Sequence, residues 1–184
     1  MHIPRIFSAA ALTAVLATTL AATLVGCSTP MPEQYANQQP RLDIQRYFNG
    51  TLDAHGMFQD RSGAVVKRFA VVMNCQWQGD TGTLDEDFTY SDGTRQKRIW
   101  TLQKTGAGTF TATAPDVIGV AQGVAAGNAL RWKYVLAQPV GDKVYHVDME
   151  DWMFLIDDKV MLNRTAMSKF GVNLGSVTLS FSKR

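Results

Sequence analysis

The chain has 184 residues, of which 46% are hydrophobic and 18% are charged, and its formal net charge is +2. This balance excludes an intrinsically disordered or collagen-like chain and a polytopic membrane protein. Because no block of like charge stands out and the chain has two cysteines, the sequence also argues against a nucleic-acid partner and a disulfide-stapled small fold.

Residues 1–26 have the pattern of a secretory leader. Arg5 supplies a positive charge, and the nearly uncharged run that follows it ends at Val25. A short apolar run with a basic flank and small residues at its end is typical of a signal peptide rather than of a resident membrane helix. The leader ends in Leu24-Val25-Gly26-Cys27, which resembles the lipobox of bacterial lipoproteins. The resemblance implies cleavage before Cys27 and lipidation of this residue. The alternative is an ordinary secretory signal with a chance cysteine.

The residues after the cysteine predict where the protein resides. Ser28 stands where an aspartate would be the usual mark of retention at the inner membrane. We therefore expect a lipid anchor in the outer membrane, facing the periplasm, with the membrane as a partner through that anchor. Residues 27–41 are rich in proline, glutamine and asparagine and lack apolar periodicity, so they predict a flexible, lipidated tether.

Residues 42–184 are enough for one domain with a real core, and their pattern is that of β-strands. Hydrophobic residues alternate with a period of two, and turn residues interrupt them at short intervals. Closure of about nine or ten strands into an antiparallel up-and-down β-barrel would remove their exposed edges. The predicted strands cover residues 48–58, 65–77, 84–90, 98–102, 110–114, 130–136, 144–149, 152–156, 160–167 and 172–181.

Residues 117–127 consist almost entirely of glycine, alanine and valine. Gly119, Gly123 and Gly127 are spaced by four, as in a helix–helix interface within a membrane. The apolar run is too short to cross a bilayer, however. We favour a bent β-segment near a barrel opening over a short helix.

Two opposite charges are predicted on the inner face of the barrel. Glu86 alternates with apolar residues on both sides, and Arg98 lies two residues before Trp100. A three-residue turn over Ser91-Asp92-Gly93 would place Glu86 directly opposite Arg98. Because buried charges are tolerated when they are paired, the two residues form either a structural ion pair or a polar anchor for the head group of a ligand.

Two further groups of polar residues lie near residue 150. His146, Asp148 and Glu150 share one strand face, which would suit a metal ion but is more typical of a solvated exterior. The apolar residues just before Glu150 stand at odd-numbered positions, and the aromatic residues just after it stand at even-numbered positions. We therefore expect a β-bulge that changes the direction of the Asp151 and Trp152 side chains. We count these last two residues among the ligand-binding candidates.

The sequence contains no motif for nucleophilic catalysis: Ser–His–Asp and Cys–His arrangements and the Gly-x-Ser-x-Gly motif are all absent. We therefore name no catalytic residue, and we expect no cofactor and no metal. Cys75 alternates with Met73 and Trp77, which is the pattern of an inert thiol in a core.

Short segments spread over residues 47–172 together carry a family resemblance. They are Tyr47-Phe48-x-Gly50, Leu84-x-Glu86-x-Phe88-x-Tyr90-x-Asp92-Gly93, Arg98-x-Trp100, Ala114-x-Asp116-Val117-x-Gly119, Gly127-Asn128-Ala129-Leu130-x-Trp132-x-Tyr134, Asp151-Trp152-Met153 and Lys169-Phe170-Gly171-Val172. With these segments the chain resembles a family of Gram-negative lipoproteins known as domain of unknown function 3833. The resemblance implies an envelope lipoprotein with a lipocalin-like β-barrel, and it implies no particular activity.

We expect a lipid-anchored barrel that holds a fatty-acyl or other hydrophobic ligand, with Glu86 and Arg98 near its polar end. A second hypothesis is an enzyme acting on lipids, with Glu86 or Asp116 as general acid or base and Arg98 as anion stabiliser. A third is an envelope scaffold whose barrel is packed solid, and the sequence identifies no protein partner. The remaining ligand-binding candidates, with Trp77 as a further lining residue, are Trp100, Asp116, Trp132, Asp151 and Trp152.

Overall fold

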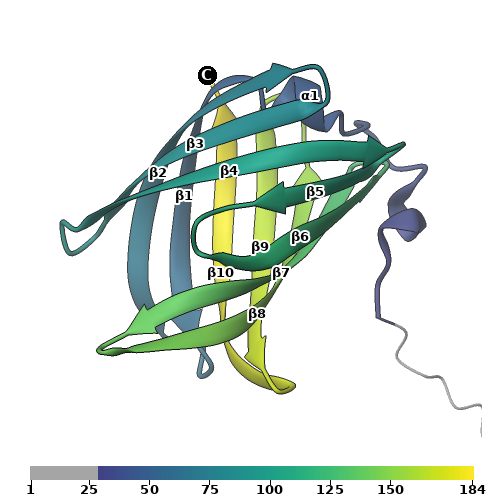
Figure 1. The fold of residues 1–184 in the computed structure, drawn as a ribbon. Helices are drawn as coiled ribbons and strands as arrows, with labels where there is room; N and C mark the ends of the chain where they lie inside the picture. The colour runs from purple at the N-terminus through teal and green to yellow at the C-terminus, as the bar shows by residue number, and fades with distance from the viewer. Residues whose placement is uncertain (1–28) are drawn as a thin grey trace, which may run out of the picture.

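Ten antiparallel strands form a closed barrel in the computed structural model, which describes residues 29–184 (Figure 1). Each strand pairs with its neighbours in the sequence, and β1 closes the wall against β10. This is the predicted up-and-down architecture, which is confirmed. The strands are β1 (Gly50–Asp60), β2 (Val65–Gln78), β3 (Thr81–Tyr90), β4 (Arg95–Gly106), β5 (Thr109–Thr113), β6 (Val117–Ala126), β7 (Ala129–Val140), β8 (Lys143–Leu155), β9 (Val160–Lys169) and β10 (Val172–Lys183).

The predicted leader and Cys27 lie outside the described residues. Within residues 29–184, none of the helices is long and apolar enough to pass through a membrane.

The turn between β3 and β4 fixes the register of these two strands, which carry Glu86 and Arg98. Gly93 adopts a positive φ of 83°, a conformation that glycine tolerates well. The Asp92 carboxylate accepts a hydrogen bond from the Thr94 backbone N–H at 3.0 Å. The resulting register places Glu86 opposite Arg98, as the turn motif predicts.

The small-residue segment is the bent strand β6. Its pairing with β7 shifts register between Ile118 and Gln122, and Gly119 has a positive φ of 73° within the shift. A Cβ atom at Gly123 would lie 2.6 Å from the ring of Trp132, so the glycine makes room for this inward tryptophan. The predicted bent β-segment is therefore confirmed.

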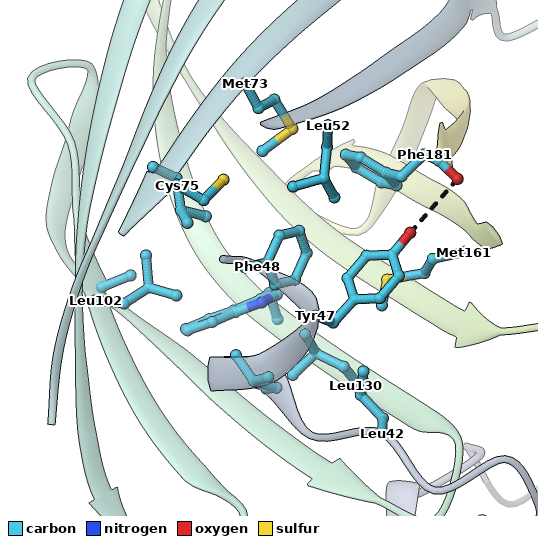
Figure 2. Packing of buried hydrophobic residues seen from close by; sticks show 14 of the residues in the cluster. Leu42, Tyr47, Phe48, Leu52, Met73, Cys75, Leu102, Leu130, Met161 and Phe181 are labelled. Atoms are coloured by element: carbon cyan, nitrogen blue, oxygen red, sulfur yellow. Dashed lines mark hydrogen bonds between the residues drawn. The ribbon is translucent and has the colours of Figure 1, made fainter. Parts of the chain in front are cut away.

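A short helix, which the strand pattern of the sequence does not indicate, covers one end of the barrel. Helix α1 (Ile44–Tyr47) begins after Asp43, whose carboxylate accepts a hydrogen bond from the Arg46 backbone N–H at 3.1 Å. Phe48, expected at the start of the first strand, instead ends this helix. Figure 2 shows Tyr47 and Phe48 packed among residues from the barrel wall, with the Tyr47 hydroxyl donating to the Phe181 carbonyl at 3.4 Å. The helix thus closes this end with apolar side chains.

Strand β8 corrects the prediction of two strands separated by a bulge. It runs from Lys143 to Leu155 and pairs with β7 and β9 without a register shift. Asp151 is buried on the same face as Met149, so the inner face continues unbroken, and Trp152 points to the outside of the barrel.

The outer face at Trp152 is covered by the N-terminal segment, which explains the misleading apolar pattern. The segment includes the 3₁₀ helix η1 (Pro32–Tyr35), which packs against β6 and β7. The Tyr35 ring meets the rings of Trp152 and Phe154 edge-on, with centroid distances of 5.9 and 5.1 Å. The described part of the expected tether therefore lies against the barrel wall from about residue 31 onward, rather than standing free of it.

Candidate functional site

A cavity of about 880 Å³ occupies the interior of the barrel. At the end covered by α1, its lining consists of buried side chains, among them Phe48, Met73 and Leu102. Toward the other end the lining aromatics, such as Phe69 and Phe88, are partly exposed. Residues 94–96 and 138–140 also line the cavity, and they lie at the tips of the β3–β4 and β7–β8 hairpins, which project from the same side of the barrel (Figure 1). The cavity therefore opens toward these two tips.

Arg98 makes its ion pair with Asp116 rather than with Glu86, which corrects the predicted pair. The Arg98 guanidinium donates to one Asp116 oxygen through Nε at 2.9 Å and Nη2 at 2.6 Å. Asp116 reaches it from the turn between β5 and β6, a contact that strand alternation does not reveal. Arg98 also lies over the rings of Phe88 and Trp100, so its orientation in the cavity wall is fixed from several sides.

Glu86 is a buried carboxyl group in the cavity lining, with 9% of its surface exposed. Burial raises its pKa to about 7. The positive charge of Arg98 lowers this pKa, whereas the negative charges of Asp116 and Asp151 raise it further. Near neutral pH, Glu86 therefore populates both its protonated and its ionised form, and it can donate or accept a hydrogen bond.

Asp151 is a second buried carboxyl group in the lining, with 7% of its surface exposed. Burial raises its pKa to about 6, while the Thr165 and Tyr134 hydroxyls and the charge of Arg98 act in the opposite direction. Its Oδ1 atom is buried and has no hydrogen-bond partner among the described residues. An unsatisfied buried acceptor is costly, so it would be stabilised by a hydrogen-bond donor brought in from outside.

Six of the seven ligand-binding candidates line this one cavity. Two of them are tryptophans, and the Trp100 ring meets Tyr134 edge-on at a centroid distance of 5.4 Å. The six residues are Glu86, Arg98, Trp100, Asp116, Trp132 and Asp151.

Trp152, the seventh candidate, lies outside the cavity, on the outer face of β8. There its indole N–H donates to Glu150 at 3.1 Å, beside an ion pair of 2.6 Å between Arg131 and Glu150. Trp77, also expected in the lining, does not line the cavity either: its indole N–H donates to the Phe48 carbonyl at 2.8 Å. Trp77 therefore supports the closed end.

Several polar residues in the lining are not among the sequence-predicted candidates, among them Tyr134, Asn163 and Thr165. Tyr134 lies on β7, and Asn163 and Thr165 lie on β9 and are almost completely buried. The Thr165 hydroxyl donates to the Asn163 side-chain oxygen at 3.1 Å. Asn163 and Thr165 alternate with Met161 and Met167 in the sequence, so their inward direction could have been read from the strand pattern.

The face formed by His146, Asp148 and Glu150 is on the outside of the barrel. His146 and Asp148 are exposed, and Glu150 is engaged by Arg131. In the part of the chain that the structure describes, no cluster of three histidine, cysteine or acidic side chains is placed to hold a metal ion.

Cys75 is buried beside the closed end, in the core cluster that contains Phe48 and Met73. Burial raises the pKa of its thiol to about 12, and the nearby carboxylate of Glu86 acts in the same direction. The predicted inert core thiol agrees with this environment.

Comparisons with known proteins identify a family and related folds. The family described as "Protein of unknown function (DUF3833)" matches residues 21–183. A search of curated proteins gives no match. Among solved structures, the chain is similar to the S-type phycobiliprotein lyase CPES from Guillardia theta, with a TM-score of 0.57 and 9% identity over 84% of this chain and 98% of that chain. It is also similar to a de novo designed fluorescence-activating β-barrel, with a TM-score of 0.44 and 12% identity over 78% of this chain and 99% of that chain.

Proposed function

This chain belongs to the family of proteins of unknown function DUF3833, and we propose that its barrel binds an apolar small molecule such as a fatty-acyl chain. The main support for the proposal is the cavity of about 880 Å³ inside the barrel. The rest of the barrel interior is packed with buried hydrophobic side chains. Ligand pockets in proteins are typically about 300–1,000 Å³, mostly apolar, with a few convergent polar groups. A solidly packed scaffold would not contain such a space.

The arrangement of the lining supports a ligand with one polar end. Aromatic and aliphatic side chains lie at both ends of the cavity, whereas the carboxyl groups of Glu86 and Asp151 and the guanidinium of Arg98 lie between them. A molecule with a polar head and an apolar tail would satisfy this cluster and bury its tail toward the open end. The similarity to the phycobiliprotein lyase is one of fold at 9% identity, and we transfer none of that protein's site residues to this chain.

A pair of tryptophan substitutions tests the proposal. Val177 lines the cavity from β10, and Thr178 is the next residue on the opposite face of the same strand. We expect the neutral probe N-phenyl-1-naphthylamine to fluoresce on binding the wild-type chain and to bind at least about tenfold more weakly to Val177→Trp, which fills the cavity. Thr178→Trp, the matched control, should bind the probe like the wild type. Equal binding by the two variants would contradict a ligand site inside the barrel.

Acid–base chemistry on a bound ligand is a second candidate function. It is favoured by one observation, the Glu86 carboxyl with a pKa of about 7 inside the cavity, because a general acid or base works best near the ambient pH. An enzyme of this kind should return a chemically altered ligand. Mass spectrometry of lipids incubated with wild-type protein and with Glu86→Gln would detect the alteration, and identical spectra in both samples would argue for binding alone.

We also propose that the protein works as a lipoprotein of the outer membrane, facing the periplasm. The support is the lipobox-like Leu24-Val25-Gly26-Cys27, together with Ser28 after it. In a Gram-negative host, radiolabelled palmitate should be incorporated into the wild-type chain and not into Cys27→Ser. The outer-membrane fraction should contain the wild type and lose the variant. Labelling of Cys27→Ser, or wild-type protein without label, would contradict the proposal.

A further inference from the structure

We infer that the ligand of this cavity carries a cationic head group, such as a protonated primary amine on an apolar chain, held by Glu86 and Asp151. This inference rests on the proposed binding function and specifies the class of ligand. It differs from a fatty-acid ligand, whose head would be an anion.

The charges that face the middle of the cavity are predominantly acidic. Glu86 comes from β3, Asp151 from β8 and Asp116 from the turn before β6, and Arg98 on β4 is the one cation among them. The hydroxyl of Tyr134 on β7 completes the titratable groups there. Nearer the open end, the titratable lining residues are Lys67, Tyr90 and Arg95.

Arg98 is not free to receive an anionic head. Two of its nitrogens already donate to Asp116, at 2.9 and 2.6 Å, and its positive charge also lowers the pKa values of Glu86 and Asp151, so one cation is shared among three carboxyl groups. A ligand carboxylate would add a fourth acid beside this single guanidinium. Like charges in a poorly solvated space repel strongly.

Glu86 and Asp151 are both nine-tenths buried or more, and neither forms an ion pair within the described residues. The Oδ1 atom of Asp151 also lacks any hydrogen-bond partner there. The two groups are close enough for the charge of Asp151 to raise the pKa of Glu86. One ammonium group has three donors and a positive charge, so in this space it offers both carboxylates an opposite charge and can donate to the unpartnered Asp151 oxygen.

The shape of the lining gives the direction of binding. Beyond the acidic groups, the closed end is filled by buried side chains such as Phe48 and Phe181. On the other side, partly exposed residues such as Phe69, Phe88 and Val177 border the space that leads to the hairpin tips. The head therefore enters first, and the tail lies against the aromatic residues of the open half.

Ligands that differ in the head group alone test this inference. Dodecylammonium, dodecanoate and dodecanol, each below its micelle-forming concentration, would compete with N-phenyl-1-naphthylamine for the full chain carrying Cys27→Ser, at pH 8. We expect dodecylammonium to bind at least about tenfold more tightly than dodecanoate, with dodecanol between them. Tighter or equal binding of dodecanoate would overturn the inference and leave the proposed function standing. Failure of the probe and of all three ligands to bind would overturn both.

Two variants assign the preference to the proposed groups. Glu86→Gln and Asp151→Asn each remove one charge and keep the shape of the side chain, so each should reduce the ratio of dodecylammonium to dodecanoate affinity by at least about threefold. Asp87→Asn, on the outer face next to Glu86, is the matched control and should leave the ratio unchanged. Circular dichroism verifies that each variant is folded. An unchanged ratio in folded Glu86→Gln and Asp151→Asn would overturn the assignment.

Discussion

Replacing Glu86 with glutamine should stabilise the unliganded barrel at alkaline pH and have much less effect at acidic pH. In the folded chain, burial raises the pKa of this carboxyl group from its ordinary value of 4.5 to about 7. The folded state therefore binds the proton more tightly than the unfolded state does, and ionisation of Glu86 disfavours folding. Glutamine has nearly the same shape and does not ionise.

The pKa values set the size and the pH range of the effect. Each pKa unit corresponds to about 1.4 kcal/mol, so a rise from 4.5 to about 7 makes the charged form roughly 3 kcal/mol less favourable in the folded state. Below pH 4.5 the carboxyl is neutral in both states and this cost is absent. The cost grows between pH 4.5 and 7 and is fully present above pH 7. The free energy of unfolding of Glu86→Gln, relative to wild type, should therefore increase by roughly 3 kcal/mol between pH 4 and pH 8.5.

Urea unfolding followed by tryptophan fluorescence measures this difference. Comparing one variant at two pH values removes any constant contribution from altered packing, because that contribution is the same at both. Asp87→Asn changes an exposed carboxyl on the outer face of the same strand and should shift stability by less than about 1 kcal/mol at either pH. If the advantage of Glu86→Gln is the same at pH 4 and pH 8.5, the raised pKa of Glu86 is refuted.

Three further predictions concern the cavity, the outer wall and the core. Dodecylammonium affinity should fall between pH 8 and pH 5, because Glu86 and Asp151, with pKa values of about 7 and 6, become neutral over this range; a pH-independent affinity in competition titrations would contradict this. Tyr35→Ala should lower the free energy of unfolding in urea by about 2 kcal/mol, since two aromatic contacts on the outer wall are lost, and an unchanged value would mean that the N-terminal segment adds no stability. The Cys75 thiol should react with Ellman's reagent at pH 8 in the Cys27→Ser chain only after denaturation, because burial raises its pKa to about 12; rapid reaction of the folded chain would show the thiol to be accessible.

The strand pattern predicts those parts of the site that depend on neighbours in the sequence. Period-two alternation turns Glu86 inward with its strand, but it does not address Asp116, which lies in a turn. The Ser91-Asp92-Gly93 turn fixes the register of one hairpin, and it places Glu86 opposite Arg98 as predicted. Both successful inferences use contacts between residues that are close in the sequence.

Alternation fails where a distant segment covers the outside of the barrel. Trp152 and Phe154 are apolar residues on the outer face of β8. Their positions predict that the inward-facing side of the strand changes after Glu150, and this change does not occur. Their cover is Tyr35, more than a hundred residues earlier in the chain. A half-buried outer face has the same composition as an inner face, so period-two reasoning cannot separate the two.

The same limit applies to the charges in the cavity, with a larger consequence for function. From the sequence, Glu86 and Arg98 form a neutral pair on adjacent strands, and a neutral pair gives little reason to prefer a cationic or an anionic ligand. In the folded chain, the Arg98 guanidinium instead forms its ion pair with Asp116, a turn residue. Asp151, which the uninterrupted β8 brings to the inner face, then adds a second buried carboxyl without a cation of its own. The acidic character of the middle of the cavity thus comes from two residues, Asp116 and Asp151, that strand pairing around the β3–β4 turn does not include, and they are the reason that we propose an ammonium head rather than a carboxylate.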